Sequence, residues 1–186
     1  MKGLFTVGRI TRVILPGSLL RSVRLPRDLR RAIADAGLHP SQIILELTEH
    51  DPIPNAADLL RVLDPFLEEG MQLSLDDVGV GFANMRLICE LQPHSIKVDS
   101  FFIEGLSKSL VKQSVVQNFV NLTSDIGPKI VAEGVEQDED ALTAMRLGVG
   151  FLQEPLFGRP MGEPCLAPLP QGFWKTLQST SQMRIL

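Results

Sequence analysis

The sequence predicts an α/β protein in which helices cover a parallel sheet, as in a (β/α)8 barrel. Short apolar runs alternate with helix-forming stretches along most of its 186 residues, which is the pattern of βαβ units. The runs end in polar side chains: Glu46, Asp76 with Asp77, Lys97 with Asp99, Glu133 and Gln153. Because the carboxyl ends of barrel strands meet on one face, we expect these side chains to share a site. A complete barrel needs about 250 residues, so the prediction is an incomplete one.

The first half of the chain contains two helix–strand pairs. Pro26 and Gly37 bracket a predicted helix over 26–36, because Pro favours the first turn and Gly ends helices. The apolar run 43–47 follows as a buried strand. A second helix over about 55–69 leads to a strand over 71–75, which we expect to be broken by the glycine-containing loop 77–81.

The pattern then recurs in the second half. Helices are predicted over 83–90, about 112–125 and about 139–147, and strands over 95–99, 129–132 and 149–153. The strands are too apolar for either face of the sheet to be wet, so helices should cover the outside. Upstream, the stretch 9–17 also has the outline of a strand.

The end of the chain differs in composition. Pro and Gly are dense over 158–172, which blocks regular structure. We therefore expect one domain over 1–161 and a tail over 162–186, with Phe173 and Trp174 anchoring a short terminal helix.

Composition excludes several classes of protein. Cys89 and Cys165 have no metal-ligand spacing, so neither a disulfide scaffold nor a zinc site is predicted. No secretion signal and no run of 18 apolar residues is visible, and we expect a cytoplasmic protein without a membrane segment. The first forty residues carry eight Lys and Arg against two acids. We interpret them as a solvated helix face rather than a contact with nucleotide or membrane phosphates. No DNA partner is expected.

Oxygen ligands dominate the predicted site. Carboxylates that cluster at strand ends repel one another unless a cation lies between them. Hard divalent cations prefer oxygen ligands, so the expected metal is Mg²⁺ or Mn²⁺. Lys97 alternates with Ile96 and Val98 and should point to the barrel interior, where it needs a carboxylate partner. It would offset phosphate charge or position the attacking water.

Five segments in fixed order carry a family resemblance. They are Glu46-Leu47-Thr48-Glu49, Leu75-Asp76-Asp77-Val78-Gly79-Val80-Gly81-Phe82, Ile96-Lys97-Val98-Asp99, Val131-Ala132-Glu133-Gly134-Val135-Glu136 and Gln153 with Phe157-Gly158-Arg159-Pro160. Together they resemble the successive motifs of the EAL domain, over about residues 13–161. The resemblance implies a modified (β/α)8 barrel that hydrolyses cyclic di-GMP to pGpG with Mg²⁺ or Mn²⁺.

The resemblance also implies residue roles. Five residues correspond to metal and water ligands: Glu46, Asp76, Asp77, Glu133 and Gln153. Lys97, Glu133 and Glu136 correspond to catalytic residues, and Asp99 and Arg159 to substrate-binding residues. Glu49 corresponds to the acid that steadies the loop after Asp77, and this loop implies a homodimer contact.

Two family ligands have no counterpart in the sequence. The Glu-Ala-Leu signature with its metal-binding Glu is absent upstream of Glu46, and Ile14 stands where the metal-binding Asn is expected. Losing two ligands leaves the remaining acids underneutralised, so metal affinity should fall sharply. We therefore expect an amino-terminally truncated EAL domain, lacking the first strands, with impaired catalysis. The alternatives are an inactive module that binds a protein or the nucleotide, and a gene remnant.

Overall fold

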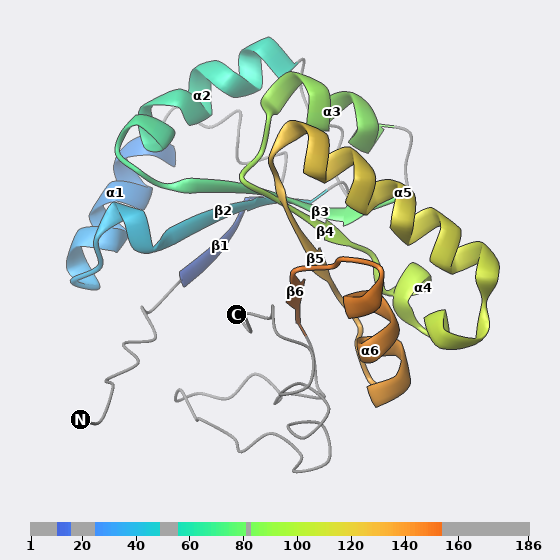
Figure 1. The fold of residues 1–186 in the computed structure, drawn as a ribbon. Helices are drawn as coiled ribbons and strands as arrows, with labels where there is room; N and C mark the ends of the chain where they lie inside the picture. The colour runs from blue at the N-terminus through green and yellow to red at the C-terminus, as the bar shows by residue number, and fades with distance from the viewer. Residues whose placement is uncertain (1–10, 16–24, 49–55, 81–82, 154–186) are drawn as a thin grey trace, which may run out of the picture. The chain divides into compact units, whose positions relative to one another are not determined.

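The computed structural model describes residues 11–15, 25–48, 56–80 and 83–153. Within these ranges the sheet has the strand order β1-β2-β3-β4-β5-β6, and helices lie between successive strands in the sequence (Figure 1). The pairs β1–β2, β2–β3, β4–β5 and β5–β6 are all parallel. The predicted parallel α/β class is therefore confirmed.

The chain forms two compact units. Unit 1 comprises Met1–Asp76 and Ala83–His94, and unit 2 comprises Asp77–Phe82 and Ser95–Leu186. The elements of unit 1 are β1 (Thr11–Leu15), α1 (Leu25–Asp35), η2 (Pro40–Gln42), β2 (Ile43–Leu47), α2 (Ala56–Glu68), most of β3 (Gln72–Val78) and α3 (Ala83–Leu91). Those of unit 2 are β4 (Ser95–Val98), α4 (Ser100–Ile103), η3 (Leu106–Lys108), α5 (Leu110–Ile126), β5 (Lys129–Ala132), α6 (Asp138–Arg146) and β6 (Phe151–Leu152).

The core of unit 1 surrounds β2. All five residues of this strand are buried, as expected for a strand covered on both faces. The apolar face of α2 contributes Leu59, Leu63 and Phe66, each at most 1% exposed. Arg30 of α1 joins the two helices, because its guanidinium bonds Oε1 of Glu69 at 2.6 Å and lies over the Phe66 ring.

The core of unit 2 lies between β4, β5 and their helices. Ile96, Val98, Val131 and Ala132 are at most 2% exposed. Helix α5 begins at its Ser109 cap, whose side chain accepts from the Lys112 backbone N–H, and ends at Gly127, a left-handed residue. The predicted helix over 112–125 is therefore present, and it starts two residues earlier.

Three features of the fold differ from the expected boundaries. Strand β3 continues through Asp76 and Asp77 to Val78, so the predicted break at residue 77 is wrong. Strand β6 covers only residues 151 and 152 instead of 149–153. The short helices α4 and η3 were not predicted, because a single helical turn is too short to show an apolar period.

Some expectations lie outside the described residues. These are the tail over 162–186 with Phe173 and Trp174, and the site residues Glu49 and Arg159. Among the helices that the structure does describe, none combines the length and the apolar character needed to cross a membrane.

Candidate metal site

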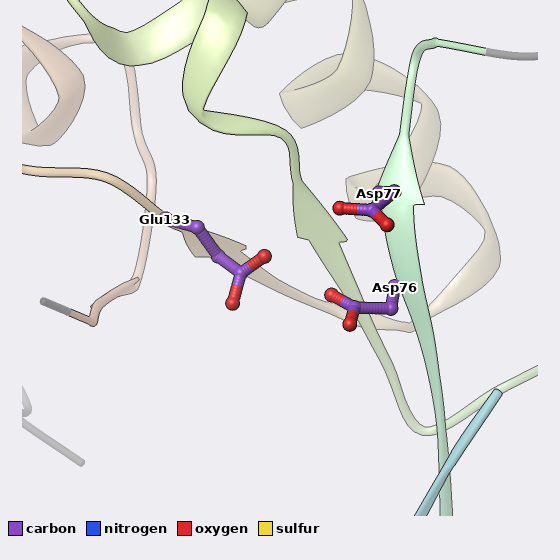
Figure 2. A group of neighbouring side chains, drawn as sticks. All are labelled: Asp76, Asp77 and Glu133. Atoms are coloured by element: carbon purple, nitrogen blue, oxygen red, sulfur yellow. The ribbon is translucent and has the colours of Figure 1, made fainter. Parts of the chain in front are cut away.

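Asp76 and Asp77 present their carboxylates to the same place although they are neighbours in one strand. In a regular strand, successive side chains point to opposite faces. Asp77 has a φ of 52°, a left-handed conformation that aspartate tolerates better than most residues. This interrupts the alternation, and both carboxylates are directed toward Glu133 (Figure 2). One carboxylate oxygen from each of the three residues lies within 4.8 Å of the other two.

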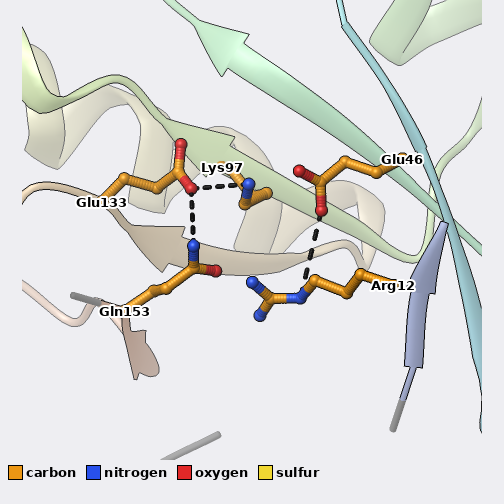
Figure 3. Close-up of polar contacts among 5 residues, drawn as sticks. All are labelled: Arg12, Glu46, Lys97, Glu133 and Gln153. Atoms are coloured by element: carbon orange, nitrogen blue, oxygen red, sulfur yellow. Dashed lines mark hydrogen bonds and ion pairs between the residues drawn. The ribbon is translucent and has the colours of Figure 1, made fainter. Parts of the chain in front are cut away.

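Glu133 connects the carboxylates to a buried cation. It follows β5 directly, and its backbone N–H donates to the Val98 carbonyl at 3.2 Å. Its Oε1 atom contacts Nζ of Lys97 at 2.5 Å and accepts a hydrogen bond from Nε2 of Gln153 at 3.0 Å (Figure 3). The Lys97 side chain is only 4% exposed. Glu133 is thus the carboxylate partner that a lysine in this position was predicted to need.

Gln153 leaves one acceptor available in the site. Its Nε2 faces Glu133, because a carboxylate can only accept. Its Oε1 is buried and accepts no hydrogen bond from the described residues. A buried carbonyl oxygen without a donor is costly. A divalent cation beside Gln153 would satisfy it. Gln153 bonds Glu133, and all four side chains offer oxygens, the ligands that hard cations prefer.

Glu46 lies in unit 1, where its carboxylate is close to the guanidinium of Arg12. The side chain is 5% exposed, and its Oε2 is 4.0 Å from Nε of Arg12 in β1 (Figure 3). Strand register pairs Ile14 with Glu46 and Glu46 with Ser74. Ile14 is therefore the neighbour of Glu46 on β1, and it is 61% exposed. An isoleucine here offers a cation no ligand.

Two other predicted site residues occupy structural positions. Asp99 is the N-cap of α4, where its side chain accepts from the Phe101 backbone N–H at 2.8 Å. Glu136 is exposed before α6 and is not part of the carboxylate cluster. Sequence reasoning did not single out Ser100 and Phe102, which pack against Gly134 and Gly79 beside the carboxylates. The Asp-Ser pair at the start of α4 is the signal that could have shown this helix.

Oxygen side chains at the ends of parallel strands, with a buried lysine among them, define an α/β protein that can hold a divalent cation at the carboxyl edge of its sheet. The EAL domain model matches residues 8–160. The chain therefore belongs to the EAL domain family, as its motifs predicted.

Similar proteins agree with this assignment. The bifunctional diguanylate cyclase/cyclic di-GMP phosphodiesterase MucR of Pseudomonas aeruginosa is 35% identical over 134 residues, or 72% of this chain and 20% of that protein. The cyclic di-GMP phosphodiesterase PdeL of Escherichia coli is 35% identical over 120 residues, or 64% of this chain and 33% of that protein. The chain thus spans between one fifth and one third of the length of these two relatives.

A solved structure shows the same fold. The Klebsiella pneumoniae BlrP1 complex with manganese and cyclic di-GMP is 33% identical, with a TM-score of 0.75. The match covers 83% of this chain and 40% of that one.

Proposed function

We propose that this chain carries part of a cyclic di-GMP phosphodiesterase site that binds Mg²⁺ or Mn²⁺. In this proposal the chain hydrolyses cyclic di-GMP to pGpG slowly. The arrangement of Asp76, Asp77 and Glu133, with Lys97 and Gln153 on Glu133, is the observation that supports this function. The named activity of MucR and PdeL and the manganese complex of BlrP1 support the choice of substrate and metal class.

The residues present divide the chemistry between them. Asp76, Asp77, Glu133 and the Oε1 atom of Gln153 would hold the cation. A bound cation supplies a Lewis acid and lowers the pKa of a bound water. Lys97, which pairs with Glu133 in a buried place, would counter the charge that develops on a phosphodiester. Gln153 holds Glu133 in place through its Nε2 atom.

Several finer assignments belong to the same proposal. The domain comprises residues 1–161 and works in the cytoplasm. Glu46 is a further ligand, Asp99 and Arg159 contact the nucleotide, and Glu136 is a further catalytic acid. Glu49 steadies the loop after Asp77, and that loop forms a homodimer contact. The exposed side chain of Val80, 66% accessible, supports the last point.

One observation favours a second candidate function, a module that binds cyclic di-GMP without turning it over. Ile14 is the β1 neighbour of Glu46, and Arg12 offers that carboxylate a resident cation. Calorimetry with cyclic di-GMP, together with an assay for pGpG, separates the two functions. Binding without product in the presence of Mn²⁺ would support the second.

Asp77→Asn should weaken Mn²⁺ binding. The substitution removes one negative charge from three carboxylates that share a cation, so we expect the Kd for Mn²⁺ to rise at least about tenfold. Calorimetric titration of the purified chain measures this. Asp138→Asn is the matched control, because Asp138 is an exposed carboxylate in the first turn of α6. Equal Kd values for the two variants would contradict the proposed ligand set.

Ile14→Asn should increase metal-dependent hydrolysis. It places an amide oxygen on β1 beside Glu46, where it can serve as an additional ligand. We expect the rate of pGpG formation with Mn²⁺ to rise by about tenfold, in line with the effect of single groups around metal sites. Ile14→Leu keeps the side chain apolar and should leave the rate unchanged. A rate that does not rise in Ile14→Asn would show that Ile14 does not limit hydrolysis.

A further inference from the structure

A short segment of unit 2 packs against both turns that carry carboxylates of the proposed site. This segment, residues 99–109, joins β4 to α5 and contains α4 and η3. We call it the bridging segment. Its two contacts involve Ser100 and Phe102, which are separated by one residue in α4.

The first contact is with the turn after Asp77. Gly79 has a φ of +114°, and a Cβ atom there would be 2.4 Å from Cε2 of Phe102. The ring also packs edge-to-face against Phe119 of α5, with ring centroids 6.0 Å apart. The backbone N–H of Asp99 also donates to the Val78 carbonyl at 3.3 Å. Phe102 therefore limits where the strand end that carries Asp77 can lie.

The second contact is with the turn after Glu133. A Cβ atom at Gly134 would be 2.4 Å from Cβ and 3.0 Å from Cα of Ser100. The backbone of the turn thus touches the first residue of α4 with no space between them. Because α4 is one continuous helical turn, its position sets the positions of both carboxylate-bearing turns.

Asp140 of α6 anchors the bridging segment. It is 4% exposed, and its two oxygens accept from the backbone N–H groups of Gly105 at 2.8 Å and Ser107 at 2.7 Å. Burial alone would raise the pKa of this carboxyl. Hydrogen bonds from the side chain and backbone of Ser107 and the backbone of Gly105, with the charge of Lys108, outweigh burial and lower the pKa. Asp140 is therefore ionised at neutral pH.

Like charges at the site explain why such an anchor is needed. The carboxylates of Asp77 and Glu133 lie within 4.8 Å and repel each other when no cation is bound. Lys97 offsets part of this repulsion at Glu133. The packing of the bridging segment against the two turns also opposes their separation.

We infer that Asp140 is a positioning residue, which through the bridging segment fixes the separation of Asp77 and Glu133. The expected loss of Mn²⁺ affinity on removing Asp140 rests on the proposed function. The expected loosening of the two turns in metal-free protein does not. Loosening the anchor lets the carboxylates move apart, which weakens a site that needs them close.

The test compares Asp140→Asn with Thr143→Ala in the full chain. Thr143 is buried in the same helix, where its hydroxyl donates to the Glu139 carbonyl at 2.7 Å and accepts from Arg146. Its loss removes hydrogen bonds within α6 and none to the bridging segment. We expect Asp140→Asn to raise the Kd for Mn²⁺ about tenfold. It should also speed amide hydrogen exchange at Asp99 and Glu133 in metal-free protein. The Asp99 amide donates to the Val78 carbonyl and the Glu133 amide to the Val98 carbonyl, so both report on the strand ends beside the two turns. Thr143→Ala should leave both quantities within about twofold.

Equal effects of the two variants on exchange and affinity would overturn the inference, because Asp140 would then act only through the stability of α6. If the unsubstituted chain binds no Mn²⁺, the proposed function fails, and the exchange rates in metal-free protein still decide the role of Asp140. If Asp140→Asn does not fold, Asp140→Glu replaces it. Asp140→Glu keeps the negative charge and moves both carboxylate oxygens by the length of one methylene. It should still speed amide hydrogen exchange at Asp99 and Glu133 more than Thr143→Ala does.

Discussion

Gly134→Ala should destabilise the protein by about 2–5 kcal/mol and weaken Mn²⁺ binding. The new Cβ would lie 2.4 Å from Cβ and 3.0 Å from Cα of Ser100, in a residue whose φ is +69°. A left-handed conformation costs an alanine roughly 1–2 kcal/mol, and overpacking adds about 1–3 kcal/mol. Because the Cα of Ser100 belongs to the backbone, the turn must move, and Glu133 moves with it. Urea unfolding and calorimetry with Mn²⁺ measure the two effects.

Gly37→Ala is the matched control for this substitution. Gly37 has a similar φ of +65°, and nothing lies within 4 Å of a Cβ atom placed there. We expect it to lose only the conformational part, roughly 1–2 kcal/mol, with Mn²⁺ affinity unchanged. Equal losses at the two glycines would show that the approach of α4 to the Glu133 turn is not tight in solution.

Lys97→Met should lower the free energy of unfolding of metal-free protein by about 3–5 kcal/mol, the usual cost of removing one partner from a buried ion pair. The substitution removes the ammonium that Glu133 contacts, in a place where Lys97 is 4% and Glu133 14% exposed. The same change removes a positive charge that repels a metal ion. We therefore expect the Kd for Mn²⁺ to fall by at least about tenfold, while formation of pGpG is lost.

Lys129→Met is the matched control, because it removes a lysine that lies outside the ion pair of Lys97 and Glu133. Lys129 is exposed at the start of β5, with its ammonium 5.6 Å from the Phe151 ring centroid. Its removal should cost no more than about 1 kcal/mol. Added Mn²⁺ should restore much of the stability of Lys97→Met, because a ligand that binds the folded state stabilises it. A Lys97→Met chain that keeps both its stability and its rate would refute the role given to Lys97.

The larger part of the fold was predictable because strand and helix periods are local properties. Strands β2 and β5 have the predicted bounds of residues 43–47 and 129–132. Helices α1, α2 and α3 lie within one residue of the predicted ends. The short helix α4 was missed, since its four residues depend on the Asp99 cap and on packing against Gly79 and Gly134.

The positions of polar residues at the strand ends were predictable, and the contacts among them were less so. Glu133 and Gln153 directly follow their strands, as expected from the runs that precede them. Lys97 and Gln153 both contact the same oxygen, Oε1 of Glu133. Residue spacing could not predict this shared contact. The resemblance assigns Asp99 to substrate binding and Glu136 to catalysis. The structure shows Asp99 capping α4 and Glu136 exposed, and both roles stay predictions.

The sequence by itself determined the parallel α/β class, the family and the row of polar residues that follow the apolar runs, because each depends on residue type and order along the chain. Only the tertiary structure decided how these residues meet. The left-handed Asp77 brings both aspartates to one side of β3. Strand register places Ile14 beside Glu46, and Asp140 reaches the bridging segment from α6. These contacts join residues far apart in the sequence, and they depend on the backbone conformation and packing that the folded chain alone defines.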